Sequence, residues 1–155
     1  MAVLSLGSNL GDRAAHLNAA IELLRMHIPV VAVSPIYETD PVGVQDVPAF
    51  LNVVALVGAD DPWSLLDVAH RVEDARGRLR SKRWGPRTLD VDVISADGLR
   101  SDSPVLTLPH PRAFERGFVL VPWLDVDPDA ELPGRGRVAD LVRAMDTSGV
   151  RRWSR

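Results

Sequence analysis

The stretch that constrains the fold most tightly is Leu89-Asp90-Val91-Asp92-Val93-Ile94-Ser95. Apolar and acidic residues alternate over its first five positions, and a period of two is typical of a β-strand. This alternation predicts that the two aspartates lie on one face of a sheet, with the apolar side chains on the other face toward a core. Positions two residues apart on a strand are roughly 7 Å apart, so the carboxylates could share two Mg²⁺ ions separated by about 4 Å.

A cluster of basic residues precedes this strand. The acidic residues of the segment 71–87 are Glu73 and Asp74, whereas its basic residues are Arg71, Arg76, Arg78, Arg80, Lys82, Arg83 and Arg87. A run of charges is usually the solvated end of a helix. Here Trp84, Gly85 and Pro86 interrupt it, and an indole beside a Gly-Pro hinge favours a mobile phosphate-binding loop. Together with the aspartate pair, the cluster predicts metal-assisted phosphoryl chemistry on a polyphosphate.

Composition limits the class of protein. With 155 residues and 46% apolar content, the chain is expected to form one domain over residues 1–155. A net charge of -3 argues against general nucleic-acid binding, and the absence of cysteine excludes disulfides and thiolate metal sites. The sequence shows no signal peptide and no apolar run of membrane-spanning length. We therefore expect a cytoplasmic monomer that binds neither nucleic acid nor a membrane.

Hydrophobic periodicity predicts the order of elements. Strands are expected at residues 2–6, 30–37, 51–57, 89–95 and 118–121, and helices at 13–27, 62–79 and 138–145. Residues 38–49 are too polar and too rich in turn formers for either element, which indicates a long functional loop. This order fits an α+β ferredoxin-like sandwich, an antiparallel sheet with helices on one face, followed by a C-terminal αβ elaboration.

Two further motifs have both a structural and a functional interpretation. The segment Gly7-Ser8-Asn9-Leu10-Gly11-Asp12 resembles a phosphate loop but lacks the Lys-Ser/Thr ending of a Walker A sequence, so a strand-to-helix turn is favoured. A lone histidine such as His110, between Pro109 and Pro111, is usually structural. Its nearness to Arg112 and Arg116 makes it a candidate phosphate contact.

Aromatic residues are few, and two of them stand beside polar candidates. Phe50 is close to Asn52, and Phe118 follows Arg116. Phenylalanines are more often core than site. However, a flat heterocycle could stack between two such rings, and an Asn side chain offers both a donor and an acceptor to its edge.

Taken together, these motifs resemble those of the 6-hydroxymethyl-7,8-dihydropterin pyrophosphokinases of folate biosynthesis. The resemblance rests on residues 6–12, 37–39, 50–52, 78–80, 83–92 and 108–112, and it extends to about Trp123. It implies transfer of the β,γ-diphosphate of ATP to the pterin hydroxymethyl group, with release of AMP. ATP and the pterin are then the expected partners, with two Mg²⁺ ions as cofactor.

The resemblance also implies individual roles. The catalytic group would be Arg78, Arg87, Asp90 and Asp92, with the two aspartates as metal ligands and Asp92 as a candidate proton acceptor. The residues expected to bind ATP are Glu73, Arg80, Arg83, Trp84, Arg87, Val93, Thr107, His110 and Arg116. Those expected to bind the pterin are Thr39, Val42, Phe50, Asn52 and Phe118.

Two other classes of function remain open from the sequence. A ferredoxin-like RNA-binding module would share the sheet, aromatics and arginines, but it would not need the aspartate pair. A nucleotidyltransferase with a D-x-D motif would use the same two metals on a similar fold. It would release pyrophosphate instead of AMP, so the reaction product distinguishes the two enzymes.

Overall fold

A central antiparallel sheet organises the computed structural model, which describes residues 1–41, 48–76 and 88–154. Within that part of the chain the sheet has six strands in the order β10-β3-β4-β1-β5, and β2 also pairs with β4. The strands are β1 (Ala2–Ser8), β2 (Val30–Val33), β3 (Tyr37–Thr39), β4 (Phe50–Val57), β5 (Asp90–Ala96) and β10 (Val150–Arg152). The predicted α+β class with an antiparallel sheet is confirmed.

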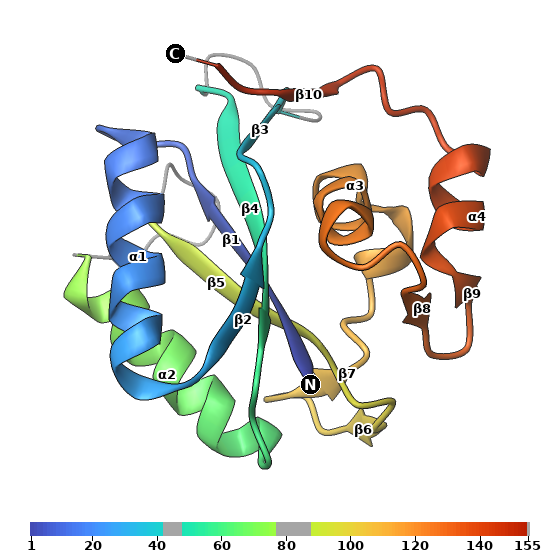
Figure 1. Ribbon diagram of the computed structural model, residues 1–155, viewed down its shortest axis with the longest axis horizontal. Coiled ribbons are helices and arrows are strands. Elements are labelled where there is room, and N and C mark those ends of the chain that lie inside the picture. Colours follow the sequence, from blue (N-terminus) through green and yellow to red (C-terminus); the bar gives the residue numbers. More distant parts are fainter. Residues whose placement is uncertain (42–47, 77–87, 155) are drawn as a thin grey trace.

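Helices lie on both faces of this sheet (Figure 1). Helices α1 (Arg13–His27) and α2 (Pro62–Ala75) cover one face, while α3 (Gly117–Val126) and α4 (Val138–Ala144) lie on the other. Two short hairpins, β6 (Ser101–Asp102) with β7 (Thr107–Leu108) and β8 (Glu131–Leu132) with β9 (Gly136–Arg137), and the 3₁₀ turn Ala113–Glu115 complete the described elements. The predicted C-terminal elaboration is therefore a second layer. None of the described helices is long and apolar enough to cross a membrane.

Two hydrophobic cores follow from the alternation of side chains along the strands. On the α1 and α2 side, Val91 and Val93 pack with Leu4 and Leu6 in what we call the helix-side core. On the α3 side, a second core joins Ile94 and residues of β1 and β4 to α3. The period of two therefore points Asp90 and Asp92 away from the helix-side core, as predicted.

Local signals explain the boundaries of α1. The Asp12 side chain accepts a hydrogen bond from the Ala15 N–H at 3.1 Å, which caps the first turn. The helix ends at His27, two residues before Pro29, and the observed bounds match the predicted range. The predicted range of α2 reaches residue 79, whereas the observed helix ends at Ala75. Residues 77–79 lie outside the described part of the chain.

Two strand predictions were wrong. The run 30–37 forms two strands, because Pro35 has no N–H to donate and the Ser34 hydroxyl accepts from the Val54 N–H at 2.9 Å in place of a ladder bond. Residues 118–121 lie in α3 and not in a strand. Burial of Val119 and Leu120 against the sheet overrides the local β-propensity of Val119 and Val121.

The C-terminal segment, whose order the sequence left open, packs on the sheet. Strand β10 pairs with β3 in antiparallel register, with Arg151 opposite Glu38. The Trp153 N–H also donates to the Ile36 carbonyl at 3.0 Å. The tail therefore forms part of the sheet edge beside β3.

A buried carboxylate on α2 holds the opposite edge of the sheet. Glu73 is 1% exposed, and its Oε2 accepts from the Val91 N–H at 2.8 Å. Among the described strands β5 pairs only with β1, and the bond to Glu73 shows that the Val91 N–H points away from that ladder. Because Val91 stands between Asp90 and Asp92, the bond fixes the strand at the aspartate pair.

We expect Glu73→Ala to lower the free energy of unfolding by about 1–3 kcal/mol, because it leaves a buried backbone N–H without its acceptor. Urea denaturation would measure the change. Glu22→Ala is the matched control, since Glu22 is exposed on α1 and its ion pair with Arg25 spans 3.8 Å. A loss for Glu73→Ala no larger than that of the control would contradict this role.

Candidate active site

Asp90 and Asp92 lie on the sheet face opposite α1 and α2, and both are partly buried. Strand pairing places Asp90 opposite Gly7 and Asp92 opposite Ser5 on β1. On the other side of β1, Asn52 of β4 is also opposite Gly7. The register therefore produces a row, Asn52–Gly7–Asp90, across three adjacent strands.

Gly7 leaves the middle of this row without a side chain. A Cβ atom at Gly7 would lie 2.8 Å from Asn52 Oδ1 and 3.4 Å from Phe50 Cδ1. The space above Gly7 is thus bordered by an amide and an aromatic ring. The sequence interpretation treated Gly7 only as part of a turn and missed this role, which depends on the register between strands.

Three of the predicted pterin-binding residues lie together beside this space. Thr39 pairs with Phe50 across β3 and β4, and Asn52 Nδ2 donates to Thr39 Oγ1 at 2.9 Å. Both polar side chains are buried, so the bond fixes the orientation of the amide. This bond uses one N–H of the Asn52 amide and does not involve Oδ1, so the amide retains a donor and an acceptor that suit the edge of a heterocycle.

Arg116 and Phe118 approach the same face from the start of α3. The Arg116 guanidinium carbon is 5.5 Å from the centre of the Phe118 ring. Burial lowers the pKa of Arg116 from its ordinary value. The negative charge of Asp92 acts against this effect, and the positive charge of Arg112 adds to it. The positive charge of Arg116 near the aspartates would favour binding of an anionic ligand between the guanidinium group and the carboxylates.

His110 presents a neutral imidazole to this region. Its backbone N–H donates to the Ile94 carbonyl at 2.8 Å, and its Nδ1 accepts from the Arg112 N–H at 3.2 Å. The ring proton therefore sits on Nε2. Burial, and then the charges of Arg116 and Arg112, lower the pKa of His110 to about 4. At neutral pH the ring can donate one hydrogen bond, for example to a phosphate oxygen.

The remaining described ATP candidates lie elsewhere. Val93 is 5% exposed in the helix-side core, on the opposite face of β5 from the aspartates. The Thr107 hydroxyl donates to the Ser103 carbonyl at 2.8 Å. Glu73 is bonded to β5, as described above. The structure does not gather Val93 and Glu73 with the aspartate face. Contact of all three residues with a nucleoside stays a prediction.

Six predicted site residues lie outside the described residues. They are Val42, Arg78, Arg80, Arg83, Trp84 and Arg87. The hypothesis of a phosphate-binding loop after α2, and the assignment of Arg78 and Arg87 to catalysis, therefore stay predictions.

The donor set suits a hard cation. Asp90 and Asp92 supply carboxylate oxygens on one strand face, the ligand type that Mg²⁺ prefers. Within residues 1–41, 48–76 and 88–154, no group of three or more His, Cys, Asp or Glu side chains gathers as a metal site. Two carboxylates leave coordination positions for phosphate oxygens and water, as is usual for Mg²⁺ bound with a nucleotide.

The lowered pKa of His110 predicts a pH dependence of stability. The unfolded chain binds a proton near the ordinary pKa of 6.5 and the folded chain only near 4. The free energy of unfolding should therefore fall as pH drops through this window, with no contribution above about 6.5. Urea midpoints at pH 7 and pH 5 should differ less for His110→Gln than for the parent chain.

The control for this experiment is His27→Gln, at the exposed end of α1. It should keep the pH dependence of the parent chain. Equal losses of stability in the parent chain and in His110→Gln would contradict the burial of a neutral ring at position 110.

Comparison with known sequences agrees with this geometry. Residues 3–128 match the family described as 7,8-dihydro-6-hydroxymethylpterin-pyrophosphokinase (HPPK). A 2-amino-4-hydroxy-6-hydroxymethyldihydropteridine pyrophosphokinase of Bacillus subtilis is 38% identical over 99% of this chain and 90% of its own length. The protein of the same name from Mycobacterium leprae is 47% identical over 92% of this chain and 80% of its own length.

Solved structures share the fold. A Plasmodium falciparum HPPK-DHPS triple mutant with pteroate superposes with a TM-score of 0.75 at 15% identity, over 97% of this chain and 46% of that chain. The wild type with pteroate gives a TM-score of 0.74 over 92% of this chain and 43% of that chain. The family match and the curated relatives, together with this fold, show that the chain belongs to the 7,8-dihydro-6-hydroxymethylpterin-pyrophosphokinase family.

Proposed function

We propose that this chain transfers the β,γ-diphosphate of ATP to the hydroxymethyl group of 6-hydroxymethyl-7,8-dihydropterin, giving the pterin diphosphate and AMP. Membership of the family supports this pyrophosphoryl transfer in folate biosynthesis. The observation that carries the assignment of residues is the row Asn52–Gly7–Asp90. It places an amide suited to a pterin edge and a carboxylate suited to a metal on one sheet face, with an open position between them.

The pterin would lie over Gly7. Asn52 and Thr39 would read the donors and acceptors of its edge, and Phe50 would cover one side of the ring. Phe118, held near Arg116 at the start of α3, would supply the second aromatic surface. Apolar cover on both sides of the ring would exclude water from the reacting hydroxymethyl group. The fifth candidate in this set, Val42, adds a backbone contact in the same hypothesis.

The triphosphate would lie toward Asp90 and Asp92, which would hold two Mg²⁺ ions. When bound, Mg²⁺ supplies positive charge that neutralises the phosphates and makes the attacking hydroxyl more acidic. Arg116 would bind an equatorial phosphate oxygen, and His110 would donate from Nε2 to another. Arg78, Arg80, Arg83 and Arg87 would complete the anionic clamp, with Trp84 sealing it.

Positioning and electrostatics account for the chemistry under this proposal. The pterin hydroxyl loses its proton, for which Asp92 is the candidate acceptor, and its oxygen forms a bond to the β-phosphorus. The bond between that phosphorus and the oxygen bridging to the α-phosphate breaks, so that AMP leaves. The two reactants must lie in line, and the residues that hold them come from rigid strands β1, β4 and β5. No covalent intermediate on the protein is needed.

The alternative functions differ in what they require of the site. A nucleotidyltransferase would use the aspartate pair in the same way, but nucleotidyl transfer does not require the amide of Asn52 and the ring of Phe50 beside Gly7. An RNA-binding module would leave the aspartates facing the phosphate backbone, which is unfavourable. A cytoplasmic location, a monomeric state and a single pyrophosphokinase domain over residues 1–155 also belong to this proposal.

Replacement of Asp92 should separate catalysis from pterin binding. We expect Asp92→Asn to lower kcat roughly 10²–10³-fold, because it removes charge that holds the metal, while the pterin Kd changes little. AMP formation and fluorescence titration of the pterin would measure the two quantities. Asp60→Asn, at an exposed turn, is the control and should resemble the parent chain. Near-normal turnover of Asp92→Asn would refute the metal assignment.

In contrast to the change at Asp92, a methyl group at position 7 should weaken pterin binding. Gly7 lies in a strand, so Gly7→Ala needs no unusual backbone conformation, but its Cβ would approach Asn52 Oδ1 to 2.8 Å. We expect roughly tenfold weaker pterin binding with little change in nucleotide binding. Gly58→Ala is the control, because its Cβ would meet only Pro29 at 3.5 Å or more. Unchanged pterin affinity would contradict the proposed position of the ring.

A further inference from the structure

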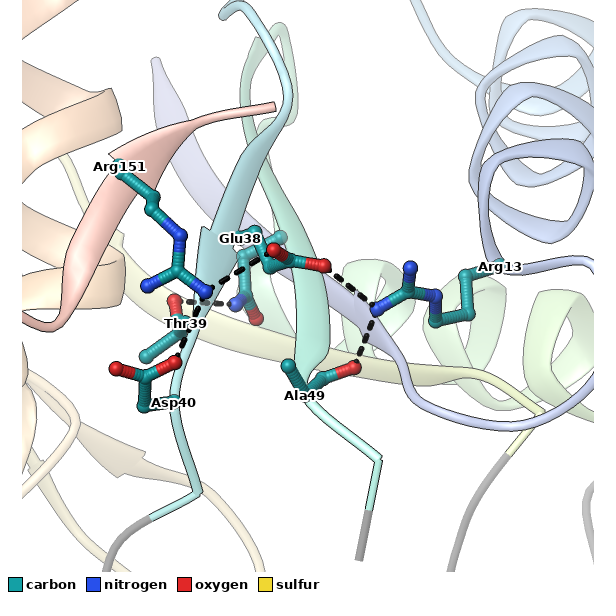
Figure 2. A network of polar contacts seen from close by, with 7 residues as sticks. Arg13, Glu38, Thr39, Asp40, Ala49 and Arg151 are labelled. Carbon is teal, nitrogen blue, oxygen red and sulfur yellow. Dashed lines mark hydrogen bonds and ion pairs between the residues drawn. The ribbon is translucent and has the colours of Figure 1, made fainter. Parts of the chain in front are cut away.

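A network of charged side chains lies behind the proposed pterin site (Figure 2). At the start of α1, Arg13 donates from one terminal nitrogen to Glu38 Oε2 at 3.1 Å and to the Ala49 carbonyl at 2.7 Å. The Arg13 and Glu38 side chains are 25% and 23% exposed. Arg13 therefore joins α1 to β3 and to the residue that precedes β4.

The second oxygen of the same carboxylate is bound from the C-terminal strand. Arg151 of β10 donates to Glu38 Oε1 at 3.0 Å and to Asp40 Oδ1 at 3.0 Å. The Asp40 N–H also donates to the Gly149 carbonyl at 3.0 Å. Glu38 thus bridges two guanidinium groups that come from opposite ends of the chain.

The residues held by this network adjoin the pterin candidates. Asp40 directly follows Thr39, and Ala49 directly precedes Phe50, while Thr39 and Phe50 are paired across the two strands. Glu38 lies between Tyr37 and Thr39, with its side chain on the opposite face of the sheet from theirs. The network therefore fastens β3 and β4 from behind, at the end where Thr39 bonds to Asn52.

The effect of this network on the position of the strand ends can be distinguished from its effect on the overall free energy of unfolding. Ion pairs with a half-exposed partner such as Arg151, which is 49% exposed, contribute little to the free energy of unfolding. The ends of paired strands are, however, the places where local opening is easiest. Four charged hydrogen bonds at one such end would limit that opening and hold the pair Thr39 and Phe50 in a single arrangement.

We infer that Glu38 is a positioning residue for the pterin half of the site, acting through Arg13 and Arg151 on the strand ends that carry Thr39 and Phe50. The inference rests on the proposed function, because the ligand whose binding it serves is the pterin. It assigns no contact between Glu38 and either substrate.

Glu38→Gln tests this role, since it keeps the shape of the side chain and removes the charge. We expect pterin Kd and KM to rise about tenfold, a change of about 1.4 kcal/mol, with kcat at saturating pterin within about twofold of the parent chain. The Kd of a non-hydrolysable ATP analogue and the melting temperature should change little. Asp140→Asn is the matched control, because Asp140 forms an ion pair with Arg143 at 3.3 Å on α4, and it should change none of these quantities.

A double-mutant cycle tests whether the residues act as a unit. Arg13→Gln should weaken pterin binding as Glu38→Gln does, and the double variant should be little worse than either single variant. Fully additive losses would overturn the inference, as would unchanged pterin affinity in Glu38→Gln. Equal losses of pterin and nucleotide affinity with a lower melting temperature would show a general structural role and also overturn it. If the parent chain binds no pterin, the proposed function fails as well.

Discussion

The alternation of side chains along β5 is the constraint on which the site depends. Because successive residues of a strand point to opposite faces, the same segment that contributes Val91 and Val93 to the helix-side core must present Asp90 and Asp92 on the other face. A shift of one residue in register would bury both carboxylates among apolar side chains, at a large energetic cost. Burial of the core therefore also fixes the position of the aspartates.

The rest of the site follows from how neighbouring elements are fastened to this strand. Pairing with β1 sets Asp90 opposite Gly7, and pairing of β1 with β4 sets Asn52 on the other side of Gly7. Glu73 holds the outer edge of β5 from α2, and the His110 N–H bonds to Ile94 farther along. The start of α3 then brings Arg116 near the aspartates. Backbone geometry, more than side-chain contacts, therefore positions the candidate chemistry.

The position of Asp90 and Asp92 on one strand face could be predicted from the sequence, because alternation along a strand is visible within a few residues. The motif around Trp84 is equally local, but it lies outside the described residues, so its role in the site stays a prediction. The helical assignment of residues 118–121 could not be predicted, since Phe118, Val119 and Val121 have high β-propensity and packing against the sheet overrides it. The role of Gly7 and the shared carboxylate of Glu38 were also missed, because both depend on pairing between residues distant in the chain.

The most direct test of this account is the identity of the nucleotide product. The chain would be incubated with ATP, Mg²⁺ and 6-hydroxymethyl-7,8-dihydropterin, with a control lacking the pterin, and the products separated by chromatography. The account predicts AMP and the pterin diphosphate in equal amounts, and no AMP in the control. Formation of ADP, release of pyrophosphate, or AMP that does not depend on the pterin would contradict it.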